Sequence, residues 1–214
     1  MHFASVWQQF CRQPTTAGPD PGIRQQWHQG RRWYAVWVVR IVEPEVHARM
    51  ASLANALGSA IRPIESSQAH ITLFVSGFVS DTPHLDDDVA PSVLLRQRAA
   101  LAAADLSLSL SVGPANSFST AAFLEVHERG GLSKARAILS GQGDELRFGP
   151  YHPHVTVGVY RDTRPAAPLA AVLSAGRRLP LLTVRPAAIE LVVFDAHVEG
   201  APLLTRHRVP VRSS

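Results

Sequence analysis

The sequence predicts an α+β protein of two similar lobes, in which two antiparallel sheets face a central cleft and the helices lie outside. Three observations lead to this prediction. Short runs of β-branched and aromatic residues alternate with segments whose apolar residues recur at helical spacing. The order strand, helix, strand, helix, strand occurs twice along the chain. In each copy the middle strand carries a His-x-Thr tripeptide.

Residues 1–30 are expected to form an N-terminal extension without regular structure, because prolines and glycines punctuate it: Pro14, Gly18, Pro19, Pro21 and Gly22. Trp7 and Trp27 are the side chains expected to dock this extension onto the body. The remainder, residues 31–214, is expected to form a single domain with two lobes.

The first copy begins with a strand over residues 34–41, rich in valine and aromatic residues. A helix follows, which Pro44 opens and Gly58 ends. The histidine-containing strand covers residues 70–75. A second helix over 91–104 precedes a half-buried strand over 106–112, in which leucines alternate with serines.

The second copy repeats this order with a strand over 121–126, a helix over 132–139 and the second histidine-containing strand over 154–160. Another helix is expected over 165–177 and another strand over 189–194. A last strand over 203–211 is expected to pair with it as a hairpin across Glu199-Gly200.

Composition narrows the class of protein. No segment approaches the roughly 18 to 20 apolar residues of a spanning helix, and residues 1–12 lack the pattern of a secretory signal, so we expect a cytoplasmic protein. Cys11 is the only cysteine, which excludes an internal disulfide and a thiolate zinc cluster.

The net charge is +4 with a pI near 10.0, and Lys134 is the only lysine. Arginine binds phosphate through its fork of N–H donors, which suits an anionic substrate. A genome that favours arginine codons explains the same composition more simply.

The His-x-Thr sites are Gln-Ala-His-Ile-Thr-Leu-Phe around His70 and His-Pro-His-Val-Thr-Val-Gly around His154. Alternate side chains of a strand share a face, so His70 points with Thr72 and His154 with Thr156. If the two copies are related by a pseudo-twofold axis, the four side chains meet in the cleft.

Such a set suits phosphoryl transfer without a metal. A neutral imidazole can accept a proton while a protonated one donates, since the ordinary pKa of histidine is about 6.5. Two threonine hydroxyls can bind the non-bridging phosphate oxygens. One His-x-Thr is usually a half-buried structural residue, but two copies at corresponding places favour catalysis.

Other residues have two interpretations each. His152 and His154 form a His-Pro-His sequence that could bind a metal, although no third ligand is evident nearby. Phe118 and Tyr151 are candidates to stack on a base, or simply pack. Arg161 is a candidate phosphate contact, and so are Arg31 and Arg32 before the first strand. The simpler interpretation of all three is solvated surface charge.

The paired motifs HITL at 70–73 and HVTV at 154–157 resemble the 2H phosphoesterase superfamily. The nearest branch is similar to the bacterial RNA 2′,3′-cyclic phosphodiesterases, also called 2′-5′ RNA ligases or LigT-like proteins. The resemblance extends over residues 31–211, through RRWYAVWV, HITLFVSGF and IELVVFDAHVEGAPLLTRHRVPV. The segment after the second motif, GVYRD, departs from the family because its arginine, Arg161, comes later than usual.

The resemblance implies a bilobal fold and hydrolysis of 2′,3′-cyclic phosphates of RNA 3′ ends or nucleotides, with 2′-5′ linkages as a further class of substrate. It implies no metal or nucleotide cofactor, and a catalytic set of His70, Thr72, His154 and Thr156. Neither a nucleotide-binding glycine loop nor Gly-x-Ser-x-Gly occurs, so an ATP-dependent ligase and a serine hydrolase are unsupported. We expect a monomer without membrane contact. The alternative is a binding module that holds a nucleotide or an RNA end in the same cleft without turnover.

Overall fold

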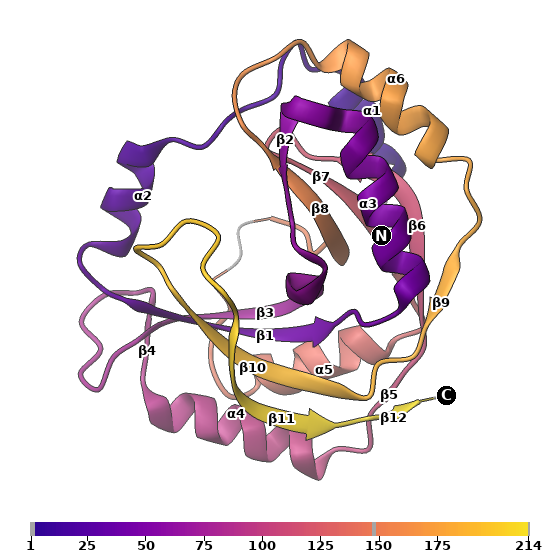
Figure 1. Cartoon of the computed structure of the whole chain (residues 1–214). Coiled ribbons are helices and arrows are strands. Elements are labelled where there is room, and N and C mark those ends of the chain that lie inside the picture. The colour runs from indigo at the N-terminus through magenta and orange to yellow at the C-terminus, as the bar shows by residue number, and fades with distance from the viewer. Residues whose placement is uncertain (1–2, 147–148, 214) are drawn as a thin grey trace.

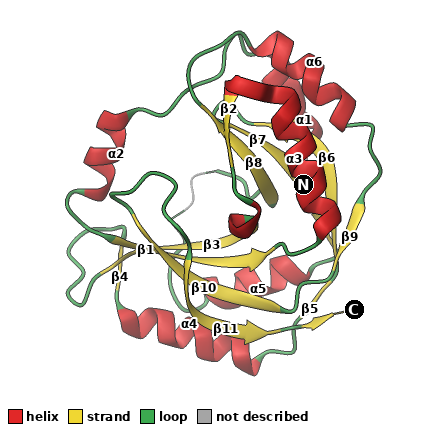
Figure 2. Ribbon diagram, in the orientation of Figure 1, coloured by secondary structure: helices red, strands yellow, loops and turns green. Residues whose placement is uncertain are grey.

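The computed structural model describes residues 3–146 and 149–213. Its helices lie outside a large sheet (Figures 1 and 2). The α-helices are α1 (Phe3–Arg12), α2 (Pro21–His28), α3 (Pro44–Leu57), α4 (Pro91–Ala103), α5 (Gly131–Ser140) and α6 (Ala166–Gly176), and two short 3₁₀ helices are η1 (Gly58–Ala60) and η2 (Ser66–Gln68). The strands are β1 (Trp33–Arg40), β2 (Ile61–Pro63), β3 (His70–Val79), β4 (Asp88–Val89), β5 (Ser107–Leu108), β6 (Leu110–Ser117), β7 (Ala121–Glu128), β8 (His154–Tyr160), β9 (Leu182–Val184), β10 (Ala188–Asp195), β11 (Leu204–Pro210) and β12 (Arg212–Ser213).

The main sheet follows the order β11-β10-β1-β3-β8-β7-β6-β9, and neighbours along this path are antiparallel. The prediction of an α+β fold with antiparallel strands and outer helices is confirmed. The two expected sheets are the two halves of this path. They are joined between β3 and β8, where Ile71 pairs with Val155.

The halves of the sheet do not follow the two copies in the sequence. Strand β6, the last strand of the first copy, pairs with β7, whereas β10 and β11 of the second copy extend the half that contains β1. The helices exchange as well. Helix α3 packs against β8 and α6, and α5 packs against β3 and α4 (Figure 1).

The core lies between the sheet and these helices. Its members include Trp37, Ile71, Leu124 and Val155, each fully buried. The indole N–H of Trp37 donates to the side-chain oxygen of Gln97 at 2.8 Å, so this buried donor is satisfied. The expected hairpin of β10 and β11 is present, with Ile189 across from Val209.

The expectation that residues 1–30 lack regular structure is wrong. Helix α1 buries Phe3 and Phe10, which lie on the same face of the helix because of their spacing. Helix α2 starts at Pro21, because proline fits the first helical position, and Asp20 caps it by accepting from the backbone N–H of Gly22 at 2.8 Å.

Both tryptophans of the extension contact the body, as expected. The ring of Trp27 lies 4.8 Å from Tyr34 and 4.9 Å from Phe78, measured between ring centroids. Trp7 packs under the guanidinium of Arg177 at 4.6 Å. Helix α1 contacts β6 and α6.

Within the described part of the chain, every helix is too short or too polar to cross a membrane.

Candidate functional site

The two histidines open the two strands that join the halves of the sheet. Ile71 of β3 pairs with Val155 of β8. In an antiparallel pair, the residue before one partner lies across from the residue after the other, so His70 lies across from Thr156 and His154 across from Thr72.

The structure therefore brings the four His/Thr residues together on one face of the sheet. All four are half-buried, whereas Ile71 and Val155 point to the opposite face and are fully buried. This separation of faces follows from the alternation of side chains along each strand.

Each imidazole is held by the carbonyl of the residue two positions before it. The Nδ1 atom of His70 lies 2.6 Å from the Gln68 carbonyl oxygen, and Nδ1 of His154 lies 2.7 Å from that of His152. A carbonyl oxygen can only accept, so Nδ1 carries the hydrogen in both rings. Proton exchange with a substrate is left to Nε2 in each case.

The charges beside the two rings differ. Arg40 of β1 lies across from His70, and Glu125 of β7 lies across from His154. The pKa of His70 is lowered, mainly by burial and further by the positive charge of Arg40, against the opposing effect of the hydrogen bond to Gln68.

Aromatic rings form a wall beside His154. The ring centroid of Phe118 lies 5.2 Å from that of His154, Phe123 lies 5.0 Å from it, and the two phenylalanines stack at 4.4 Å. Phe118 was a sequence candidate. The sequence analysis did not identify Phe123. Strand β7 pairs Phe123 with Thr156 and Glu125 with His154, and this register places Phe123 at the site.

Tyr151 lies next to Thr72. Its hydroxyl donates to the Thr72 carbonyl at 3.2 Å, and the guanidinium of Arg136 lies 3.9 Å from its ring centroid. Arg136 also donates to the Leu73 carbonyl at 2.7 Å and pairs with Glu145. These contacts tie the segment before β8 to the first motif strand.

The structure separates the candidate arginines from the histidines. Arg161 follows the end of β8, about 20 Å along the strand from His154, and its Nε donates to the Ile61 carbonyl at 3.0 Å. Arg31 pairs with Asp87 and Asp88 at the far end of β3. Arg32 pairs with Asp195 at 2.8 Å. All three arginines therefore have protein partners away from the two histidines, and their contact with a phosphate stays a prediction.

The His-Pro-His sequence does not gather further ligands. His152 lies against aromatic rings, 5.8 Å from Phe3 and 6.4 Å from Phe118 between centroids. Among residues 3–146 and 149–213, no group of three or more His, Cys, Asp or Glu side chains is placed to hold a metal ion.

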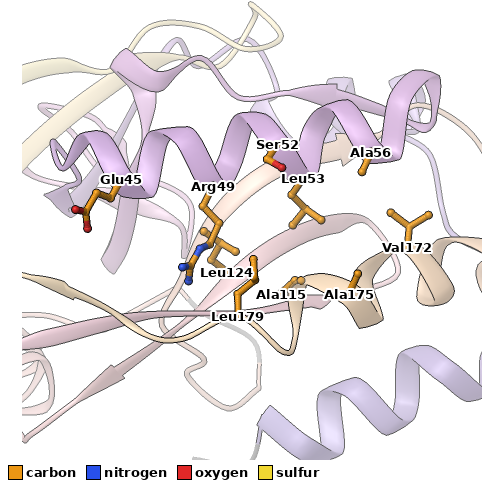
Figure 3. Close-up of a pocket in the computed structure, with 11 residues that line it drawn as sticks. Glu45, Arg49, Ser52, Leu53, Ala56, Ala115, Leu124, Val172, Ala175 and Leu179 are labelled. Atoms are coloured by element: carbon orange, nitrogen blue, oxygen red, sulfur yellow. The ribbon is translucent and has the colours of Figure 1, made fainter.

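An apolar groove of about 400 Å³ lies on the other face of the sheet, between α3 and α6 (Figure 3). Its wall includes Leu124, which pairs with Val155 and so faces away from the histidines. Arg49 lies between Glu45 and Leu53 along α3 and donates to the Pro180 carbonyl at 2.6 Å. The groove is thus separate from the His/Thr site.

The fold matches several solved structures. E. coli LigT in complex with 3′-AMP aligns with a TM-score of 0.61 and 14% identity, over 84% of this chain and 98% of that one. A protein of Thermus thermophilus aligns with a TM-score of 0.58 and 15% identity, over 84% and 98%. A protein of unknown function from Agrobacterium tumefaciens gives 0.56 and 11%, over 84% and 86%.

No curated protein matches the sequence at a significant level. The family model described as "2′-5′ RNA ligase superfamily" matches residues 42–197, which is most of the chain and contains both His-x-Thr motifs. The chain therefore belongs to the 2′-5′ RNA ligase superfamily, and the resemblance to the 2H phosphoesterases is confirmed.

Proposed function

We propose that this protein is a metal-independent phosphodiesterase that hydrolyses 2′,3′-cyclic phosphates of RNA ends or nucleotides, with 2′-5′ linkages as a second class of substrate. The observation that carries the proposal is the pairing of β3 with β8, which sets two imidazoles and two threonines on one surface. The superfamily assignment supports the class of reaction.

Hydrolysis by this set needs two proton transfers. The Nε2 atom of one neutral histidine accepts a proton from water while the water oxygen bonds to phosphorus. The bond from phosphorus to one ribose oxygen breaks, and the second histidine donates its Nε2 proton to that oxygen. The product is a phosphate monoester beside a free hydroxyl, and proton exchange with solvent restores both histidines.

The carbonyls of Gln68 and His152 orient the two rings for this exchange, because each fixes the tautomer of one histidine. In the proposal, the hydroxyls of Thr72 and Thr156 donate to the non-bridging phosphate oxygens. Such donors stabilise charge that grows on these oxygens in the transition state.

Phe118 lies beside His154 and Tyr151 beside Thr72, and these two residues are the proposed contacts for the base and the ribose. Phe118 offers a ring beside His154, and stacking accepts any base because every base has a π face. The E. coli LigT structures include complexes with 3′-AMP, ATP and NADP+, which supports a nucleotide as the substrate class here. Arg161 is left out of the proposed contacts because of its distance.

The test is hydrolysis of nucleoside 2′,3′-cyclic phosphates in EDTA. We expect turnover by the wild type and losses of at least about 100-fold in His70→Ala and in His154→Ala, the scale of general acid–base catalysis. His84→Ala, in an exposed loop, is the matched control and should keep full activity. Full activity in both site variants would refute the proposal.

Binding without catalysis is the competing function for the same set of residues. Calorimetry with a nucleoside 2′-phosphate would then show binding, while no cyclic phosphate is turned over. Activity that requires an added divalent ion would instead favour a metal site at the His-Pro-His sequence.

A further inference from the structure

The pseudo-symmetry of the two histidines is broken by charge. Register pairing places Arg40 directly across from His70 and Glu125 directly across from His154. Side chains that lie across from one another in adjacent strands share a face. One histidine therefore has a cation as its cross-strand neighbour, and the other has a carboxylate.

Arg40 also holds the backbone around His70. Its Nη1 donates to the Ser67 carbonyl at 3.3 Å and its Nη2 to the Leu203 carbonyl at 3.0 Å. The N–H of Leu203 in turn donates to the side-chain oxygen of Gln68 at 3.0 Å. The Gln68 carbonyl accepts from His70, so Arg40 braces the turn that orients this ring.

The charged groups on the other strands offset only part of the positive charge of Arg40. Glu190 of β10 lies 3.4 Å from Arg40, and Arg208 of β11 lies 3.8 Å from Glu190. Glu190 also accepts from the hydroxyl of Thr205 at 2.9 Å. Two guanidinium groups thus share one carboxylate on the His70 side, while His154 of β8 is the neighbouring titratable group.

On the other side, Glu125 is almost fully buried. Its carboxylate accepts from Arg177 at 2.8 Å and from Asn116 at 2.7 Å, and it lies 3.4 Å from His127. The field of the carboxylate is therefore partly compensated by Arg177.

We propose that Arg40 is a positioning residue that keeps His70 neutral in the resting protein, so that His70 accepts the proton of the attacking water and His154 donates to the leaving oxygen. This assignment rests on the proposed phosphodiesterase function. Burial and a nearby cation both disfavour the charged imidazole, and these are the causes that lower the pKa of His70.

The decisive measurement is the titration of the His70 ring by NMR in the full chain. Arg40→Gln should move the titration midpoint to higher pH. Arg40→Lys, which keeps a charge without the fork, should restore it toward the wild-type value. Glu190→Gln should move it to lower pH, since both guanidinium groups then lack their shared carboxylate.

Opposite shifts of the His70 midpoint in Arg40→Gln and Glu190→Gln would show an effect of charge. A structural disturbance alone gives no reason for the shift to change sign between these two variants. Arg62→Gln is the control. Arg62 pairs with Glu199 in the loop that precedes β11, so its loss loosens the same loop without removing the charge across from His70. Its His70 midpoint should equal that of the wild type.

The acidic limb of kcat/KM should coincide with the His70 midpoint and move with it in Arg40→Gln. A His70 midpoint that is unchanged in both Arg40→Gln and Glu190→Gln overturns the proposal. An acidic limb of kcat/KM that does not move in Arg40→Gln overturns it as well. If the midpoints shift as expected but no cyclic phosphate is hydrolysed by the wild type, the phosphodiesterase function fails while the effect of Arg40 on His70 stands.

Discussion

Ile71 of β3 and Val155 of β8 face each other across the joint between the two halves of the sheet, and both are fully buried. Their contact fixes the distance between two motifs that lie far apart in the sequence. The positions of His70 and His154 therefore depend on two apolar side chains that carry no chemistry themselves.

Ile71→Ala should destabilise the protein and disturb the site together. Loss of a buried isoleucine side chain costs about 2 to 5 kcal/mol of unfolding free energy, which urea denaturation measures. Ile23→Ala, at an exposed position, should stay within about 0.5 kcal/mol of the wild type. Equal stability of the two variants would show that the joint is not under packing constraint.

Stability should fall as the pH falls through the range in which unfolded histidine becomes protonated. Burial and Arg40 lower the pKa of His70 in the folded protein, so below about pH 6.5 the unfolded chain binds the proton more readily. His70→Asn should make the loss of unfolding free energy between pH 8 and pH 5 shallower, whereas His84→Asn should not. Identical slopes for His70→Asn and the wild type would contradict the pKa direction.

Alkaline pH should weaken the fold through Tyr160. Burial raises its pKa to about 12, with the hydrogen bond between its hydroxyl and that of Ser117 as a smaller opposing cause. An unfolded tyrosine ionises near pH 10, so the folded state loses stability above that pH. Tyr160→Phe should resist alkaline unfolding better than the wild type, as followed by phenolate absorbance and circular dichroism. A lower midpoint pH in the variant would count against this.

Phe118→Leu should weaken binding of substrates that carry a base. Base stacking on an aromatic ring contributes about 1 to 3 kcal/mol, so KM should rise by roughly 5-fold to 150-fold with little change in kcat. Ribose 2′,3′-cyclic phosphate, which has no base, is the control substrate and should show no such difference. An equal rise in KM for both substrates would mean that Phe118 acts only by packing against His154.

Phe10→Ala should show that the N-terminal extension belongs to the folded body. Phe10 is 1% exposed and stacks against Tyr160 at 6.3 Å between ring centroids. Loss of such a ring costs about 3 to 5 kcal/mol, measurable by thermal or urea unfolding. Gln9→Ala, on the exposed side of the same helix, should have almost no effect. A neutral result for Phe10→Ala would mean that α1 is dispensable.

The periodicity of apolar residues was enough to predict most elements of the body, because each has one buried face. Strand alternation was also enough to predict that the histidine and the threonine of each motif share a face, because a strand fixes which side chains do so. The extension was misjudged because Pro14 and Pro21 were treated as interruptions. Pro21 in fact starts a helix, and the apolar residues of α1 were the available signal.

The residues that neighbour the site could not be predicted from the sequence, because their positions depend on the register between distant strands. Nothing local to Arg40 indicates that it will lie across from His70, and the same holds for Phe123 and Thr156. Arg161 was a reasonable candidate by its proximity in sequence. An extended strand places it beyond the end of β8 that is opposite His154.

The exchange of helices between the two halves has a consequence for folding. Helix α3 precedes β3 in the chain but packs against β8, and α5 precedes β8 but packs against β3. A fragment that ended after the first copy would leave α3 without the strand that it covers, and β3 without α5. The two copies are therefore expected to unfold in a single cooperative transition, and neither should be recoverable as a stable fragment.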